Sequence, residues 1–209
     1  MKRLLSLFIV SLVAVTVFAQ DDDGITSIKV AYKGNAPTIT DFVDAILSED
    51  GLGEALGLFD SYWQMYKKNR KMPPAVRLKI DKPNGFVSFS HNYAEDNSTL
   101  SVETCYWNCK DGRHKIVGQV IASYQNGRPV MGQYDGLMFY TYDSVTHRLK
   151  WTPSVDLCGE EFGEMGLIDG TVINLPSVGK DISIWKPEAG STKHYLLKWT
   201  GGGFLFVAD

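Results

Sequence analysis

The chain from Ala75 onward alternates apolar and polar residues with a period of two, and turn sequences recur at short intervals. Such alternation indicates strands with one buried face, and Asp-Gly or Asn-Gly between two strands is typical of a β-hairpin. The turns Lys110–Arg113 and Gln125–Arg128 carry these signatures. The pattern therefore predicts a mostly antiparallel sheet, built as a meander of successive hairpins.

Strand boundaries follow from the same alternation. We expect strands at residues 76–80, 86–90, 100–107, 115–124, 130–134, 137–142, 148–152, 171–174, 182–186, 195–199 and 204–207. A Gly-rich acidic passage, Asp156–Gly170, interrupts the meander and is expected to be its longest loop. Loops of this length are frequent carriers of function.

Helical periodicity is confined to the region before these strands. Apolar residues recur at helical spacing in 39–47, after the N-cap candidate Thr38, and again in 52–66, before the stop at Pro73. Gly51 and Gly53 leave only a short connection, which predicts a helical hairpin or an L packed on one face of the sheet. The expected fold class is α+β, β-rich overall.

A basic run, Lys67–Lys71, ends the second of these helices. Cations at a helix C-terminus are stabilised by the helix macrodipole, so a solvated helix end is one interpretation. A patch that binds phosphate or membrane headgroups is the other.

The N-terminus has the features of a secretory signal peptide. Lys2 and Arg3 precede an apolar stretch, Leu4–Val17, that is too short to span a membrane, and the pattern Val17-Phe18-Ala19 at its end is typical of a signal cleavage site. We expect cleavage after Ala19 and an exported chain without membrane insertion.

The expected division of the chain is a signal peptide at 1–19, a helical segment at 20–74 and a sheet region at 75–209. Residues 20–209 are expected to form one domain. Their net negative charge disfavours a nucleic-acid partner.

Three cysteines follow the signal peptide, an odd number that does not suit a disulfide-built scaffold. Cys105 and Cys109 are too far apart along one straight strand to pair with each other. A disulfide of Cys158 with Cys105 or with Cys109 is the pairing we expect, leaving one thiol free. Buried thiols are the alternative.

Enzyme motifs are absent from the sequence: it has no nucleophile elbow, zinc-protease motif, phosphate loop or dinucleotide fingerprint. Its histidines, which we expect at the surface or in hydrogen bonds, are scattered singly: His91, His114, His147 and His194. The richest acidic cluster supplies the only catalytic candidates: Asp156, Glu160, Glu161 and Glu164. A solvated loop is favoured over a Ca²⁺ loop, because the cluster lacks the spacing of an EF-hand. It is also favoured over a glycosidase pair, because paired catalytic carboxylates carry no local sequence signature that would single these out. We expect no metal and no cofactor.

Tryptophan is the other residue type of interest. Trp107, Trp151 and Trp185 lie on predicted strands or at their ends. Aromatic residues pack well across a sheet, but exposed rings also stack on sugars, so these three are candidate ligand-binding residues.

Three segments carry a resemblance: the signal end Val17–Gln20, the phrase Glu103–Gly112 and the closing Tyr195–Phe204. Together they resemble secreted proteins of gut Bacteroidetes. The resemblance implies export to the periplasm, cell surface or medium, and it implies no catalytic residue.

The sequence thus favours an exported, non-enzymatic binding module of the cell envelope, with a glycan or a protein as its ligand. A carbohydrate-active hydrolase using the loop carboxylates is one alternative. A structural or inhibitory envelope protein is another.

Overall fold

The computed structural model describes residues 27–49, 53–133, 135–165 and 167–208. The predicted signal peptide, residues 1–19, its cleavage site after Ala19 and the connecting Gly51 lie outside the described residues. The described chain is β-rich and its strands pair antiparallel, as the alternation predicts. They form two sheets rather than one.

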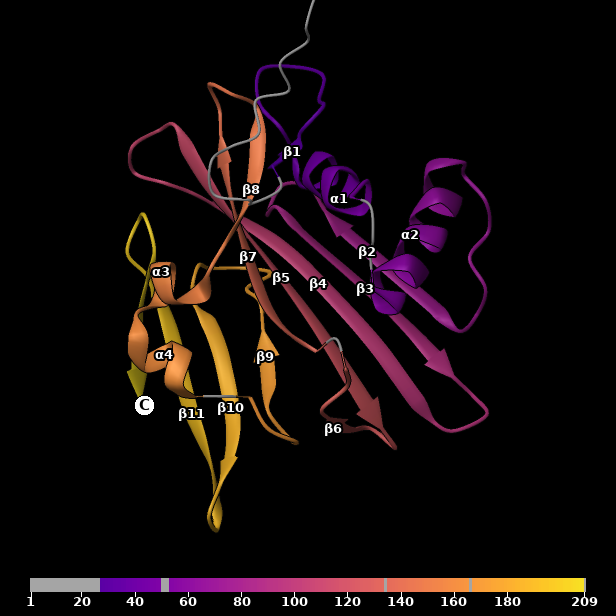
Figure 1. Cartoon of the computed structure of the whole chain (residues 1–209). Coiled ribbons are helices and arrows are strands. Elements are labelled where there is room, and N and C mark those ends of the chain that lie inside the picture. The colour runs from indigo at the N-terminus through magenta and orange to yellow at the C-terminus, as the bar shows by residue number, and fades with distance from the viewer. Residues whose placement is uncertain (1–26, 50–52, 134, 166, 209) are drawn as a thin grey trace, which may run out of the picture.

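Sheet A has eight strands in the order β1-β8-β7-β5-β4-β3-β2, with β6 paired to β5 beside this path (Figure 1). From β2 to β8 it follows the expected meander except at β6, because β7 pairs with β5 and not with β6, and β1 adds to the end of the sheet next to β8. Its strands are β1 (Ser27–Lys29), β2 (Val76–Asp81), β3 (Phe86–Tyr93), β4 (Ser98–Asn108), β5 (His114–Gln125), β6 (Arg128–Val130), β7 (Gly136–Asp143) and β8 (Arg148–Thr152).

Sheet B has four strands in the order β12-β11-β10-β9. Its strands are β9 (Val172–Asn174), β10 (Ile182–Glu188), β11 (Ser191–Trp199) and β12 (Phe204–Ala208). Sequential strands are hydrogen-bonded neighbours throughout, so this sheet is also a meander.

Two helices, α1 (Ile39–Leu47) and α2 (Glu54–Lys67), lie close to the positions that periodicity predicts. The N–H of Thr38 donates to the carboxylate of Asp41 at 2.7 Å, which closes the start of α1. The predicted N-terminal helical hairpin is not supported. The helices follow strand β1 and lie at residues 39–67, and the apolar side chains of each are buried in clusters with residues of sheet A.

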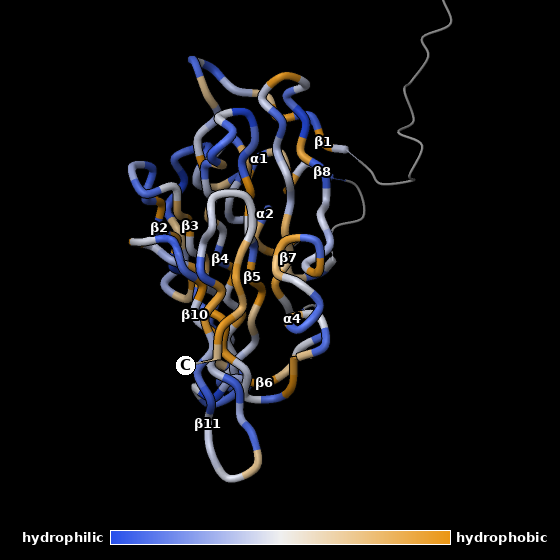
Figure 2. The backbone as a smooth tube through the Cα atoms, turned by 90° about the vertical axis from the view of Figure 1, so that its left-hand side faces the viewer, coloured by the Kyte–Doolittle hydropathy of each residue, from blue (hydrophilic) through white to orange (hydrophobic). Residues whose placement is uncertain are grey.

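The molecule has three layers, with α1 and α2 on one face of sheet A and sheet B on the other (Figure 1). Between the sheets lie Phe139 and Trp107 from sheet A with Ile184 and Leu197 from sheet B, all buried. Under the helices, Phe59 of α2 stacks on Phe89 of β3 with ring centroids 4.9 Å apart. Figure 2 shows hydrophobic stretches along β5 and neighbouring strands, in the middle of the molecule.

One predicted loop is wrong. The passage Asp156–Gly170 contains two short helices, α3 (Ser154–Cys158) and α4 (Glu160–Met165). Cys158 and Phe162 from these helices are buried in the cluster between the sheets, so a few apolar side chains hold them in place. Gly159 separates the helices with φ at 82°, a conformation that glycine adopts readily.

Candidate functional site

Trp107, the first of the three candidate tryptophans, is a core residue. It is 4% exposed, and its indole N–H donates to the carbonyl oxygen of Lys180 at 2.8 Å. Its ring also packs edge-on against Phe204, with centroids 5.0 Å apart. A ring enclosed in this way has no exposed face for a ligand, so the core packing considered for Trp107 is what the structure shows.

The other two candidates are exposed but lie apart. Trp151, 48% exposed, is opposite Tyr140 in the β7–β8 pairing, and Tyr140 belongs to the core under the helices. Cross-strand partners share a face, so Trp151 lies on the helix side of sheet A. Trp185, 43% exposed, lies on β10 of sheet B. The two rings therefore belong to different sheets and cannot form one surface.

The four acidic candidates stay in solvent. Asp156 is on α3 and the other three, Glu160, Glu161 and Glu164, are on α4, and all four are exposed. Within the part of the chain that the structure describes, no group of three or more His, Cys, Asp or Glu side chains is arranged to hold a metal ion. Nothing in this geometry favours acid–base chemistry at these carboxylates.

The three cysteines are free thiols, so the predicted disulfide of Cys158 with Cys105 or Cys109 is not formed in the structure. Cys105 and Cys158 are buried in the cluster between the sheets and Cys109 packs against it. Apolar burial accommodates a thiol without a covalent partner. It also raises the pKa of Cys158 to about 12 and that of Cys105 well above its usual range, which leaves both as protonated, unreactive thiols.

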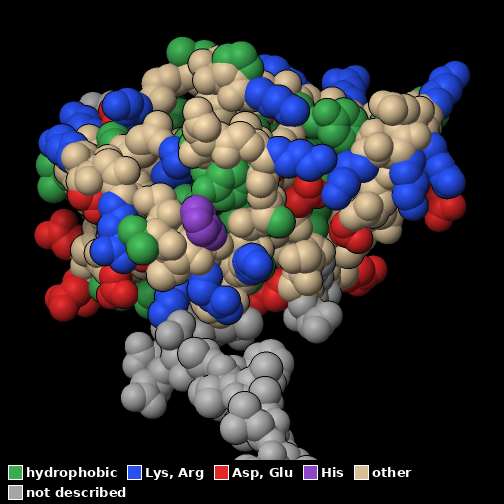
Figure 3. All heavy atoms as spheres, turned by 90° about the horizontal axis from the view of Figure 1, so that it is seen from above, with side chains coloured by type: hydrophobic (Ala, Val, Ile, Leu, Met, Phe, Trp, Pro, Cys, Tyr) green, Lys and Arg blue, Asp and Glu red, His purple; other side chains and the backbone are tan. Residues whose placement is uncertain are grey.

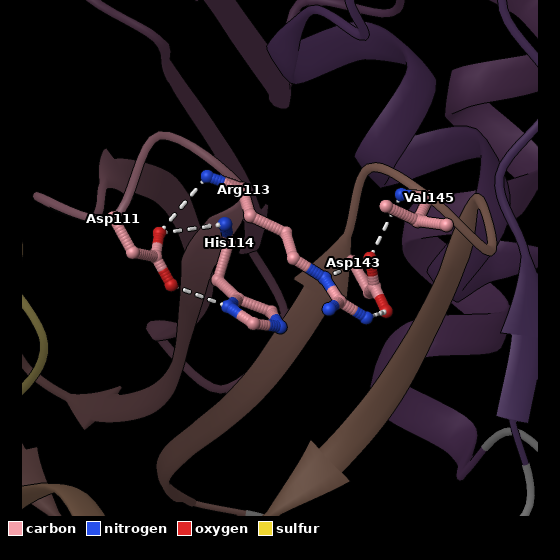
Figure 4. Close-up of polar contacts among 5 residues, drawn as sticks. All are labelled: Asp111, Arg113, His114, Asp143 and Val145. Atoms are coloured by element: carbon pink, nitrogen blue, oxygen red, sulfur yellow. Dashed lines mark hydrogen bonds and ion pairs between the residues drawn. The ribbon is translucent and has the colours of Figure 1, made fainter.

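A polar network joins two turns at one end of sheet A (Figure 4). Asp111 accepts the backbone N–H groups of Arg113 at 3.0 Å and His114 at 2.9 Å and also contacts the His114 ring, and these bonds lower the pKa of Asp111 to about 2. Arg113 donates from Nε to Asp143 at 3.0 Å, and Asp143 also accepts the N–H of Val145 at 2.8 Å. Both carboxylates are therefore engaged in holding the turns together, and we assign this network a structural role.

The outer face of sheet B is the strongest candidate for a binding site. Ile182 and Ile184 of β10 point into the core and are fully buried, so Ser183 and Trp185 between them point outward. Trp185 is directly opposite His194 on β11 and Val172 on β9. These three side chains form one row across the outer face.

Trp185 is held in a fixed orientation within this row. Its ring stacks on the His194 imidazole with centroids 4.1 Å apart and an interplanar angle of 21°. The His194 ring is fixed in turn, because its Nε2 is 3.0 Å from the Ser183 hydroxyl oxygen. The result is an aromatic surface that is exposed and still ordered.

A second row, parallel to the first, extends the surface. Ser183 is opposite both Asn174 and Leu196, and Leu196 is opposite Val207 on β12. Further along the same two strands, Lys198 of β11 is opposite Leu205 of β12, and Leu205 is 58% exposed. We call the whole outer surface the sheet B platform. Its members are Val172, Asn174, Ser183, Trp185, His194, Leu196, Lys198, Leu205 and Val207.

The sequence makes Trp185 a candidate by its residue type and gives no comparable signal for the residues around it. For His194 it predicts only a surface position or a hydrogen bond, and it carries no signal for Leu196. The usable signal is the pairing of the hairpin 182–199, because its register places Trp185 opposite His194. That register requires knowing that the turn lies at residues 189–190.

In the described residues, no helix is both long enough and apolar enough to cross a membrane. Comparisons with protein-family models, with curated proteins and with solved structures gave no match to this chain.

Proposed function

We propose that this chain is an exported, non-enzymatic binding module of the cell envelope, and that it holds a glycan on the sheet B platform. The observation that carries the proposal is the Trp185 ring, which is 43% exposed while stacked on His194. The C–H groups of a sugar ring are attracted to the negative face of an indole. A ring that is already ordered loses little conformational entropy on binding.

The polar residues of the platform suit the same ligand. The Ser183 hydroxyl, the exposed Asn174 amide and the exposed Lys198 ammonium lie in rows beside Trp185, on the same face of sheet B. Sugar hydroxyls both donate and accept hydrogen bonds, and these groups supply both functions. Binding sites of this kind combine an apolar surface with a few fixed polar groups.

The cellular location in this proposal comes from the sequence. Lys2 and Arg3, the apolar stretch Leu4–Val17 and the small residue Ala19 form the pattern of an exported precursor. Glycans are abundant in the envelope and outside it, so the ligand class and the location agree.

The test compares two tryptophans of similar exposure. Trp185→Ala and its matched control Trp151→Ala are screened with the unmodified protein against bacterial and host glycans, and affinities for any glycan bound are measured by calorimetry. We expect Trp185→Ala to abolish binding, because it removes the exposed ring of the sheet B platform. Trp151→Ala removes a similarly exposed ring from sheet A, so it should change the dissociation constant by less than about twofold.

Other outcomes point to other functions. Binding that survives in Trp185→Ala and is lost in Trp151→Ala contradicts the sheet B platform. Release of cleaved sugar, lost in Glu160→Gln or Glu161→Gln, supports the hydrolase instead. A protein recovered by crosslinking, with no glycan bound in the screen, supports a structural or inhibitory envelope protein.

A further inference from the structure

Positive charge is concentrated in one short segment of this acidic protein. Residues 66–80 contain six Lys or Arg side chains and no Asp or Glu, whereas the whole chain has a net charge of −3. The remaining residues carry nine more acidic than basic side chains. A local excess of this size attracts anions even though the protein as a whole repels them.

The end of α2 explains only part of this charge. Lys67 is in the last turn of the helix and pairs with Asp44 at 2.8 Å. Lys68, Arg70 and Lys71 are exposed and form no ion pair with any described residue. The macrodipole acts only within the last turn, so it does not account for Arg70 and Lys71, which lie beyond the helix.

An amphiphilic groove lies beside these cations. It has a volume of about 470 Å³ between the C-terminal end of α2 and the edge strand β2. Its apolar side is formed by Met72, Leu78 and Ile80. Its remaining lining residues are Tyr66, which is 38% exposed, Asn69 and Arg70.

The chain is folded back sharply to form this groove. Asn69 adopts a positive φ of 51°, and the N–H of Arg70 donates to the carbonyl oxygen of Met65 at 2.9 Å. These features end α2 and place the basic run next to its own last turn. Figure 3 shows Lys and Arg side chains beside hydrophobic ones on the side where α2 lies in Figure 1.

We propose that this surface, residues 66–72 with Leu78 and Ile80, docks the protein onto the headgroups of an anionic lipid bilayer. Anionic headgroups attract clusters of Lys and Arg, and aromatic rings such as Tyr66 are favoured at the boundary between headgroups and acyl chains. The apolar side of the groove favours a bilayer over a soluble polyanion. The acyl chains of a bilayer can cover Met72 and Leu78, whereas a soluble polyanion has no apolar groups to do so.

Edge strand β2 adds two further cations. Leu78 and Ile80 pack towards the core under α2, so Arg77 and Lys79 project from the opposite face of the strand, and both are exposed. Long basic side chains can extend past the edge of a sheet. A bilayer lying along β2 can therefore contact Arg77 and Lys79 as well as the groove on the other face of the strand. The docking surface lies on sheet A and is independent of the sheet B platform.

The test is sedimentation with vesicles made of phosphatidylglycerol and phosphatidylcholine in equal parts. We expect the triple variant Lys68→Gln, Arg70→Gln, Lys71→Gln to lower the partition coefficient by about 100-fold, at about fivefold per cation. The matched control neutralises three exposed cations elsewhere, Lys33→Gln, Arg128→Gln and Lys180→Gln, and should change it by less than about twofold. All variants share the same N-terminal residues, so any contribution from Leu4–Val17 cancels.

A second variant, Tyr66→Ser, tests the apolar contribution. It leaves the charge unchanged, and we expect it to weaken vesicle binding at least threefold while leaving binding to heparin beads unaltered. Equal losses in the triple variant and its control overturn the proposal, as does equal binding to vesicles of phosphatidylcholine alone. Heparin binding together with unchanged vesicle binding in Tyr66→Ser also overturns it, in favour of a soluble polyanion.

Discussion

Sheet A is covered on both faces and sheet B on one, and the burial patterns of their strands differ accordingly. In β5, at the middle of sheet A, six consecutive residues from Ile116 to Ile121 are buried, because helices cover one face and sheet B the other. In β10 of sheet B, buried Ile182 and Ile184 alternate with Ser183 and Trp185. A sheet with one face in solvent keeps the alternation, and a covered sheet loses it.

This comparison locates the candidate site. Aromatic rings in the middle of sheet A are enclosed, as Trp107 is, and contribute to stability. A ring on the open face of sheet B, as Trp185 is, contributes little to stability and is available to a ligand. The predictions below test this division, starting with the largest expected effect.

Phe139→Ala should be the most damaging of these substitutions. Phe139 is fully buried between the sheets and its ring lies 5.5 Å from that of Phe204. The cavity left behind should lower the free energy of unfolding by about 3–5 kcal/mol, measured by urea denaturation. The control is Leu205→Ala on the open face, which should cost less than about 1 kcal/mol. Similar losses for the two variants would contradict the division between covered and open faces.

Gly118→Ala should also destabilise the covered sheet. A Cβ at Gly118 would lie 2.9 Å from the ring of Trp107, whose indole hydrogen bond to Lys180 limits its movement. We expect a loss of about 1–3 kcal/mol in urea denaturation. Gly57→Ala, at a half-buried position of α2 where an added Cβ would have no neighbouring atom within 4 Å, is the control and should be neutral or stabilising. An unchanged free energy of unfolding in Gly118→Ala would show that the Trp107 ring can move aside, so that the packing between the sheets is not tight at this position.

Glu103 should make the stability of the covered sheet depend on pH. Its carboxylate accepts the N–H of Leu175 at 3.1 Å, but burial has the larger effect and raises its pKa above the ordinary value of 4.5. A raised pKa means that the folded state binds the proton more tightly than the unfolded state does. The contribution of Glu103 is therefore fully present below about pH 4.5 and is lost as the pH rises through the folded-state pKa.

The measurement is urea denaturation across that pH range for the unmodified protein and for Glu103→Gln. The variant should lose less stability than the unmodified protein as the pH rises, since its amide does not titrate. Glu161→Gln, an exposed carboxylate of α4, is the control and should leave the pH profile unchanged. Parallel profiles for all three proteins would show that burial between the layers does not perturb Glu103.

Trp185→Ala should have the smallest effect on stability. Its ring is 43% exposed and rests on His194, so we expect a change of less than about 1 kcal/mol in the same denaturation experiment. Loss of glycan binding with this small change would show that the variant is folded and that the open face binds the ligand. A loss as large as that of Phe139→Ala would place Trp185 in the core instead.

Local signals in the sequence predicted most of the elements. The Asp-Gly and Asn-Gly turns mark hairpins in which Gly112 and Gly127 adopt positive φ, and strands β4 and β5 beside them are close to their predicted bounds. The strand predicted at 130–134 is wrong in position, because β6 ends at Val130. The helices at 39–47 and 54–67 follow from their apolar periodicity. Strand β1 and the short helices α3 and α4 have too few residues to show a clear apolar period, and the sequence does not predict them.

The candidate site was only partly predictable. Trp107 and Trp185 have the same chemistry and both lie on alternating strands, yet one is 4% and the other 43% exposed. The signal for Trp185 was its residue type, and the signal for His194 was hidden in the pairing of two strands. Sequence alone could not separate the buried ring from the exposed one.

The period of two and the positions of the turns are properties of the sequence by itself, because each depends on residues close together in the chain. The division into two sheets, the covered faces of sheet A and the open face of sheet B were decided by the tertiary structure. The physical reason is that burial is set by whatever layer packs on a strand, and that layer comes from distant residues: Trp107 is enclosed by Trp199 and Phe204, nearly a hundred positions away along the chain.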